Sequence, residues 1–275
     1  MSGFLAAPQR ELEAPRVSIV IPALNEALNL SVVLPQLPKV HEVILVDGGS
    51  VDGTVMAARR ALPSIITVLQ RRRGRGNALA AGFSRVTGDI VVTFDADGSA
   101  DPVEVTRFVE TLKSGADFAT GSRFIAGGGS ADITRVRRWG SWFLNLLFNL
   151  GFGTRSKDLC YGYNAFWADL IPLLDLPDHA SPSVPSGRLG WGDGFEIEAI
   201  INCRFAAAGL AITEVPSVEK PRMFGKSHRR GVLDGFRVLR TMVIEWRRAR
   251  VGRKLNSKLA KPAYADPAEK PRVAV

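Results

Sequence analysis

Short apolar runs alternate with stretches of helical character along the first half of the chain. The runs are rich in β-branched residues and occupy positions 16–22, 42–47, 64–70, 90–94 and 117–121. Helices are predicted between them, at 27–36, 55–62, 78–86 and 103–114. Apolar strands that alternate with helices through short connections are typical of a parallel sheet covered on both faces. The pattern therefore predicts an α/β fold with a mostly parallel central sheet.

The second half of the chain is less regular. A glycine-rich loop at 126–130 precedes a predicted helix at 135–150, which has arginines at its start and aromatic residues along its body. A long loop rich in Pro, Ser and Gly spans 172–194, and loops of this length in compact domains are often functional. A helix at 195–208 and a strand at 211–218 follow.

A last predicted helix, 232–250, places its large apolar side chains on one stripe. These are Val232, Phe236, Leu239, Val243 and Trp246. The stripe suits docking on the protein core and docking on a membrane surface equally well. We expect a flexible leader (1–15), one α/β domain (16–231), an amphipathic C-terminal helix (232–251) and a disordered basic tail (252–275).

The charge balance indicates an anionic partner. The 275 residues carry a net charge of +9, from 36 Lys and Arg against 27 Asp and Glu. Nucleic acid, a membrane surface or a phosphorylated substrate would each fit, but no zinc-finger or RNA-binding signature supports the first. Two cysteines without ligand spacing indicate a reducing compartment. The sequence has neither the features of a signal peptide nor an apolar run of ~18 residues, so we expect a soluble or peripheral, cytoplasmic protein.

Polar side chains follow three of the predicted strands where each strand ends. They are Pro22 to Glu26, Asp47 to Ser50, and the pair Asp95 and Asp97. Carboxyl ends of parallel strands meet at one sheet edge, where ligands bind in open α/β sheets. Two carboxylates with no His or Cys nearby suit Mg²⁺ or Mn²⁺. A polar turn that caps the next helix is the alternative, and it explains Asp101 but neither Asp95 nor Asp97.

This row of strand ends suits a nucleoside diphosphate. Carboxylates at Asp47 and Glu26 can accept hydrogen bonds from a nucleoside, and a metal at Asp97 can hold a diphosphate. Arg75 and Arg123 can meet the remaining phosphate oxygens. Neither a dinucleotide fingerprint nor a P-loop occurs in the sequence. The arginines at 71–75 would otherwise be a solvated run of charge.

Seven segments together resemble family 2 glycosyltransferases, most closely the dolichyl- or polyprenyl-phosphate mannose or glucose synthases. In order they are IVIPALNE, ILVDGGSVDGT, GRGNALAAG, VVTFDADGSADP, TGSRF, KDLCYGYNAFW and ITEVPSVEKPRMFGKSH, and they extend from about Arg16 to Arg250. The resemblance implies a GT-A fold, a nucleotide-sugar donor, Mg²⁺ or Mn²⁺, and inversion of the anomeric centre. One departure is that Gly48 stands where many members have a second aspartate.

The resemblance also implies roles for individual residues. Asp97, with help from Asp95, would hold the metal, and Arg123 and Asp158 would act at the reaction centre. The residues expected to bind the donor or the phosphates are Pro22, Asn25, Glu26, Asp47, Gly49, Arg75, Gly76, Asp95, Arg137, Ser141, Arg222 and Lys226. An ionised lipid phosphate needs no strong base. A sugar hydroxyl would need one, and Asp158 or Asp193 is then the candidate, ahead of Glu196 and Glu198.

The resulting prediction is an inverting, metal-dependent transfer of a hexose from a GDP-mannose or UDP-glucose type donor to a polyprenyl or dolichyl phosphate. Alternatives are transfer to a hydroxyl of a glycolipid, polysaccharide or natural product, a sugar-phosphate nucleotidyltransferase, and a non-catalytic binding module. Family members with a membrane domain carry additional C-terminal transmembrane helices, and this sequence has none. We therefore expect a peripheral enzyme, attached through the 135–150 helix or through a separate membrane protein.

Overall fold

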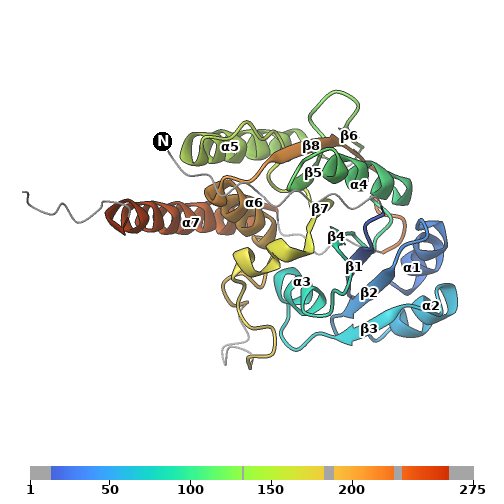
Figure 1. The fold of residues 1–275 in the computed structure, drawn as a ribbon. Helices are drawn as coiled ribbons and strands as arrows, with labels where there is room; N and C mark the ends of the chain where they lie inside the picture. Colours follow the sequence, from blue (N-terminus) through green and yellow to red (C-terminus); the bar gives the residue numbers. More distant parts are fainter. Residues whose placement is uncertain (1–13, 132, 183–188, 226–230, 260–275) are drawn as a thin grey trace, which may run out of the picture.

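The computed structural model describes residues 14–131, 133–182, 189–225 and 231–259, with side chains from 234 to 251 in the last range. The expected leader up to residue 13, Lys226 and the tail from 260 lie outside these residues. A sheet of seven strands forms the centre, in the order β3-β2-β1-β4-β7-β5-β8 (Figure 1). The strands are β1 (Val17–Ala23), β2 (Glu42–Asp47), β3 (Ile66–Leu69), β4 (Ile90–Thr93), β5 (Phe118–Ser122), β7 (Asn164–Trp167) and β8 (Ile212–Pro216).

Six of these strands agree with the predicted runs, and the sheet is mostly parallel as predicted. The sequence pattern missed β7, which pairs antiparallel with both β4 and β5. All four residues of β7 are buried, so its sequence shows no alternation of polar and apolar positions. Its insertion separates β4 from β5 and brings the segment before it, residues 158–163, to the edge where β4 ends.

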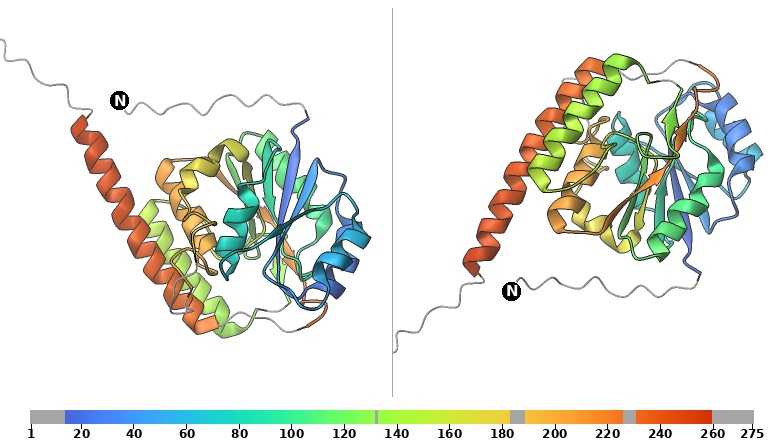
Figure 2. Two further views of the ribbon diagram at one scale, coloured as in Figure 1. Left: turned by 90° about the horizontal axis from the view of Figure 1, so that it is seen from below. Right: turned by 90° about the horizontal axis from the view of Figure 1, so that it is seen from above.

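Helices cover both faces of the sheet (Figures 1 and 2). On one face, Phe83 and Phe205 make edge-to-face contacts with Phe166 of β7. On the other face, Phe108 stacks on Tyr163. The helices that supply these contacts and their neighbours are α1 (Ala27–Val33), α2 (Thr54–Ala61), α3 (Arg75–Phe83), α4 (Val105–Lys113) and α6 (Ile197–Ala208), with short 3₁₀ turns η1 (Leu34–Gln36), η2 (Pro102–Glu104) and η3 (Ala168–Leu174).

Two long helices, α5 (Arg135–Phe152) and α7 (Gly231–Leu259), lie side by side against α6 (Figure 2). A second apolar cluster joins them to α6, and its buried members are Leu144, Phe148, Leu159, Ala199, Cys203, Val238 and Met242. Helix α7 continues to Leu259, eight residues beyond the predicted end, so the expected disorder from residue 252 is wrong for 252–259. Within the described ranges, no helix combines the length and the apolar character required to cross a bilayer.

The face of α7 that docks on the core differs from the predicted stripe. Val238, Thr241, Met242 and Glu245 are buried, whereas Phe236 of the predicted stripe is 67% exposed. The docked face contains a buried ion pair, in which the Arg204 guanidinium of α6 lies 2.8 Å from the Glu245 carboxylate. The periodicity of apolar residues cannot identify a buried helix face that contains an ion pair. Helix α7 therefore packs on the protein core, through a face other than the predicted one.

Candidate active site

The polar strand ends meet at one sheet edge, as the sequence predicted. Strands β2, β1 and β4 are adjacent and parallel, and Ala23 is in register with Asp47. Asn25 has a positive φ of 57° and accepts a hydrogen bond from the Val51 amide through Oδ1, at 2.9 Å. The side chain of Asn25 therefore holds the turn after β2 in place.

Asp47 is a buried carboxylate with one oxygen engaged. Its Oδ2 accepts hydrogen bonds from the backbone amides of Gly49 and Ser50, both at 3.1 Å. Gly49 has a φ of +87°, which suits glycine and directs its amide to the carboxylate. The Asp47 Oδ1 atom is buried and has no partner among the described residues. A buried acceptor without a partner is costly, so this atom is suited to an N–H or O–H of a ligand.

The two aspartates after β4 have different surroundings. Asp97 is partly exposed, and its Oδ1 accepts a 3.0 Å hydrogen bond from the Ser99 amide. Asp95 is more buried and forms an ion pair with Arg75. Among the described residues, no group of three or more His, Cys, Asp or Glu side chains could hold a metal. A cation here would take at most two carboxylates from the protein, and a diphosphate and water would supply the other oxygens. This donor set fits Mg²⁺ or Mn²⁺.

Arg222 lies at the same edge, between the nucleoside and metal positions. Its Nη2 donates to Glu26 Oε2 at 2.6 Å, and its Nη1 is 3.6 Å from Asp97 Oδ2. The Met223 amide donates to the Asp97 carbonyl oxygen at 3.1 Å. The structure thus brings together Glu26, Asp97 and Arg222, as predicted.

The arginine run at 71–75 is not a solvated run of charge throughout. Arg72 forms a buried ion pair with Asp193 at 2.8 Å, and Arg75 pairs with Asp95 and Glu198. The Gly76 amide donates to the Asp193 carbonyl at 2.8 Å, and a Cβ at Gly76 would lie 1.8 Å from the Gly192 carbonyl oxygen. The contacts of Gly76 are therefore with the 192–193 backbone, and this differs from the phosphate contact that the sequence indicated.

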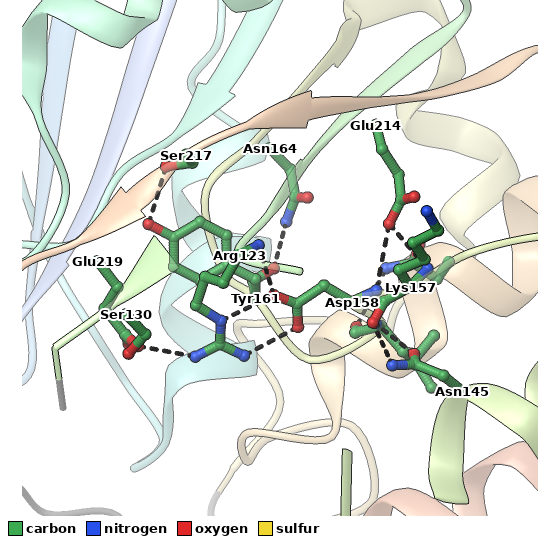
Figure 3. Close-up of polar contacts among 12 residues, drawn as sticks. Arg123, Ser130, Asn145, Lys157, Asp158, Tyr161, Asn164, Glu214, Ser217 and Glu219 are labelled. Atoms are coloured by element: carbon green, nitrogen blue, oxygen red, sulfur yellow. Dashed lines mark hydrogen bonds and ion pairs between the residues drawn. The ribbon is translucent and has the colours of Figure 1, made fainter. Parts of the chain in front are cut away.

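Arg123 and Asp158 form the most buried ion pair at the site (Figure 3). The Arg123 Nε donates to Asp158 Oδ2 at 2.7 Å, and its Nη2 donates to Asp158 Oδ1 at 2.8 Å. Its Nη1 donates to Glu219 Oε2 at 2.9 Å, and Ser130 Oγ also donates to that oxygen. Burial alone would lower the pKa of Arg123, but Asp158 and Glu219 outweigh it and raise the pKa above its ordinary value. Arg123 therefore stays protonated.

These contacts bear on the two candidate bases. Both carboxylate oxygens of Asp158 accept from Arg123, and both oxygens of Asp193 accept from Arg72. Asp158 is entirely buried. With both oxygens held by a guanidinium, neither carboxylate presents a free oxygen to an acceptor hydroxyl. The geometry gives Asp158 the task of orienting Arg123 and does not favour the catalytic role that the sequence indicated.

A cavity of about 420 Å³ lies between α5 and the start of α7. Its walls are mostly apolar, from residues such as Phe143, Leu144, Phe195, Val238 and Leu239. Its polar lining includes Arg75, Arg123, Arg137, Ser141 and Glu198. The predicted residues Arg123, Arg137 and Ser141 therefore share one cavity. The wall that α7 supplies was not predicted, because nothing in the sequence indicates that α7 would pack beside α5.

Comparison with known proteins agrees with this arrangement. Residues 18–171 match the family model described as Glycosyl transferase family 2. The chain belongs to this family. The protein is therefore a glycosyltransferase, and the alternatives of a nucleotidyltransferase and a non-catalytic module are set aside. The family match ends before α6 and α7, so the wall of the cavity that α7 supplies lies outside it.

Two curated relatives of this glycosyltransferase align with most of its length. It is 32% identical to the undecaprenyl-phosphate mannosyltransferase of Micrococcus luteus, over 86% of this chain and 99% of the relative. It is also 32% identical to the polyprenol monophosphomannose synthase of Mycolicibacterium smegmatis, over 84% of this chain and 86% of the relative. Glucosyl-3-phosphoglycerate synthase from Mycobacterium tuberculosis, crystallised with Mn²⁺, UDP and glucosyl-3-phosphoglycerate, has a TM-score of 0.62 at 22% identity, with 84% of this chain and 80% of that chain covered. The fold is the GT-A type that the resemblance implied.

Proposed function

We propose that this glycosyltransferase moves a hexose from a nucleotide sugar to a polyprenyl phosphate. The observation that carries the proposal is the cavity between α5 and α7, which combines apolar walls with Arg137 and Ser141. An isoprenoid chain suits the apolar walls, and its phosphate suits the polar side. Arg75 lines this cavity and also pairs with Asp95, so the acceptor would lie beside the donor diphosphate.

The phosphate of the acceptor would bind near the start of α5. Arg137 and Ser141 are four residues apart on that helix and therefore lie on one face. Arg137 is in the first turn of the helix, where the helix dipole favours an anion, and Ser141 follows one turn later. Arg123 is next to this position, but the two carboxylates of Asp158 and Glu219 outweigh its single charge. We infer that Arg123 donates hydrogen bonds from a fixed position and that Arg137 supplies a second guanidinium to the same cavity.

The contacts of Asp158 and Asp193 support a phosphate acceptor over a hydroxyl acceptor. A phosphate oxygen is ionised at neutral pH and can attack the sugar without a base. A hydroxyl needs a base, but Asp158 and Asp193 are both held by arginines. The names of the two curated relatives, which specify undecaprenyl-phosphate and polyprenol as acceptors, support the same choice.

The donor would bind along the ends of β1, β2 and β4. The unpartnered Asp47 Oδ1 is suited to an N–H of the base, and Pro22, one residue before the register partner of Asp47, would line the same position together with Glu26. Asp97, with Asp95 beside it, would hold Mg²⁺ or Mn²⁺, which neutralises charge on the departing nucleoside diphosphate. The Mn²⁺ and UDP in the crystal structure of the Mycobacterium tuberculosis enzyme support this donor class.

A substrate panel tests the proposal. The purified protein would be incubated with Mn²⁺ and radiolabelled GDP-mannose, UDP-glucose or UDP-galactose, with and without a short polyprenyl phosphate. We expect label in the organic phase with one donor, only when the lipid phosphate is present. The matching polyprenol, which lacks the phosphate, should receive no label. Transfer to polyprenol, or only to water-soluble acceptors, would contradict the proposed acceptor.

We also propose that α5 rests on the membrane that contains the acceptor. Val136 and Trp139 are more than 70% exposed, and Trp142 and Leu150 are also exposed. Exposed arginines flank them at 135 and 138. A helix with aromatic and apolar residues beside cations binds the interface of an anionic bilayer. The same helix lines the cavity, so attachment of α5 would bring the cavity to the membrane that holds the lipid.

Vesicle binding measures this attachment. The double substitution Trp139→Ala and Trp142→Ala should lower cosedimentation with phosphatidylglycerol vesicles several-fold, because both indoles lose their place in the interface. Met56→Ala, which removes an exposed apolar side chain from α2, should bind as the wild type does. Equal binding of all three proteins would contradict a role for α5. If none of them binds vesicles, a separate membrane protein would have to bring the enzyme to its acceptor.

A further inference from the structure

Three buried charged side chains connect the metal position to the cavity. Asp95 follows β4, Arg75 begins α3, and Glu198 lies in the first turn of α6. Arg75 Nη1 forms an ion pair with Asp95 Oδ1, and Arg75 Nε donates to Glu198 Oε1 at 2.9 Å. The side chains are only 12%, 10% and 5% exposed, in the order Asp95, Arg75, Glu198. They form one continuous ionic contact through the interior.

Glu198 is held independently of Arg75. Its Oε2 accepts a hydrogen bond from Asn164 Nδ2 of β7 at 3.0 Å, and the same Nδ2 donates to the Tyr161 carbonyl at 3.1 Å. The carboxylate is thus fixed between α6 and the sheet. It gives the Arg75 guanidinium a stationary anchor on the side opposite Asp95.

The backbone that carries Arg75 is fixed as well. Gly74 has a φ of +114°, and a Cβ at Gly74 would lie 2.0 Å from the Asp193 carbonyl oxygen. Gly76 packs equally closely on the Gly192 carbonyl. The start of α3 therefore has little freedom to move, and the position of the guanidinium is decided by its two carboxylates.

The charges exclude a simple phosphate-binding role for Arg75. One guanidinium between two carboxylates has a net charge of −1, which repels a phosphate and attracts a cation. An arginine side chain is always protonated in proteins, so the cluster of one guanidinium and two carboxylates is negative.

We propose that Glu198 is a positioning residue for the metal, which acts through Arg75 on the carboxylate of Asp95. The inference rests on the proposed function, because it takes Asp95 and Asp97 as the cation site. Glu198 fixes Arg75, and Arg75 fixes the direction of Asp95. Without the charge of Glu198, Asp95 is the one carboxylate left beside Arg75, and the net charge of the cluster changes from −1 to 0. Both changes weaken the binding of a divalent cation.

Mn²⁺ titration followed by electron paramagnetic resonance, in the presence of UDP or GDP, tests this role without any turnover. Partners that orient metal ligands typically change metal affinity about 10–100-fold, so Glu198→Gln should weaken Mn²⁺ binding by roughly tenfold. Glu196→Gln is the matched control. Glu196 is equally buried near the start of the same helix, but it accepts hydrogen bonds from the Gly192 and Gly194 amides and does not contact Arg75. Its Mn²⁺ affinity should match that of the wild type.

A double-substitution cycle distinguishes positioning from a general effect on stability. Asp95→Asn should weaken Mn²⁺ binding, and the further change Glu198→Gln should then add nothing, because the carboxylate that Glu198 orients is gone. Glu198→Asp keeps the charge on a shorter side chain and should bind Mn²⁺ more tightly than Glu198→Gln. If Glu198→Gln folds poorly, Glu198→Asp can be compared with the wild type in its place. Glu198→Asp should bind Mn²⁺ less tightly than the wild type does.

The outcomes separate this inference from the proposed function. If the wild type binds no Mn²⁺, or if Asp97→Ala binds it equally well, both the metal site and the role of Glu198 are overturned. If Asp97→Ala loses Mn²⁺ but Glu198→Gln and Glu198→Asp bind it as the wild type does, only the role of Glu198 is overturned. An undiminished effect of Glu198→Gln in the Asp95→Asn background would also overturn it.

Discussion

Replacement of Asp97 by alanine is expected to lower kcat/KM for sugar transfer by about 10²–10³-fold or more, the scale on which loss of one electrostatic contact to the transition state acts. Asp97 is the more exposed of the two aspartates after β4, and within the part of the chain that the structure describes no arginine lies within normal hydrogen-bond distance of its carboxylate. Without the Asp97 carboxylate, the protein loses its main ligand for the metal ion that neutralises the diphosphate. Initial rates at varied acceptor concentration, with saturating Mn²⁺ and nucleotide sugar, would measure the change in kcat/KM.

Asp101→Ala provides the control for Asp97→Ala. Asp101 lies four residues further along the same loop, where it caps η2 by accepting from the Val103 amide and pairs with Lys220. Loss of a capping side chain typically costs about 1 kcal/mol of stability. The variant should therefore keep its transfer activity at a temperature well below its Tm. Retention of activity by Asp97→Ala, or equal losses in both variants, would refute the assignment of the metal to Asp97.

Asp158→Asn should be the most destabilising single change at the site. The substitution removes one of the two carboxylates that pair with Arg123. The carboxylate that is removed is entirely buried. Removal of one partner from a buried ion pair costs about 3–5 kcal/mol. Denaturant unfolding would measure this loss. Glu110→Gln, which breaks a surface pair with Lys113, should cost about 1 kcal/mol or less.

The pH dependence of the residual activity separates orientation from base catalysis. If Asp158 only orients Arg123, the variant has a lower kcat but the same pH dependence as the wild type. If Asp158 were a base, its loss would remove the decline in rate at low pH. A changed pH profile together with unchanged stability would contradict the role that the geometry supports and would favour a hydroxyl acceptor.

The donor side of the site could be predicted from sequence to a large extent. Buried parallel strands are continuous apolar runs, and a polar residue at the end of such a run marks the sheet edge. Asp47 and Asp97 could be placed on this basis, because adjacent parallel strands carry their ends to the same edge. Glu26 follows the end of the first strand and could be placed in the same way, whereas Arg222 was placed by resemblance. The ion pair between them joins residues 196 positions apart. The sequence could not reveal that one oxygen of Asp47 lacks a partner.

The arginines could not be predicted in the same way. Arg72, Arg75 and Arg123 occur in segments that suit phosphate binding, yet each pairs with a carboxylate from a distant part of the chain. The partners of Arg72 and Arg75 in the 193–198 region are more than 120 positions away. Local pattern carries no information about such pairs. The antiparallel strand β7 escaped prediction for a related reason, since only its neighbours β4 and β5 define it as a strand.

The division of the cavity between α5 and α7 has a consequence for how such enzymes can diversify. Helix α5 lies within the segment that matches the family, whereas the opposite wall comes from Gly235, Phe236 and Leu239 of α7, outside that segment. Under the proposed function, the sugar and its nucleotide are recognised by the ends of β1, β2 and β4 together with Arg222, which all lie outside α7. The C-terminal helix could then change from one relative to another, and with it the length or saturation of the lipid that is accepted, without any cost to donor selection.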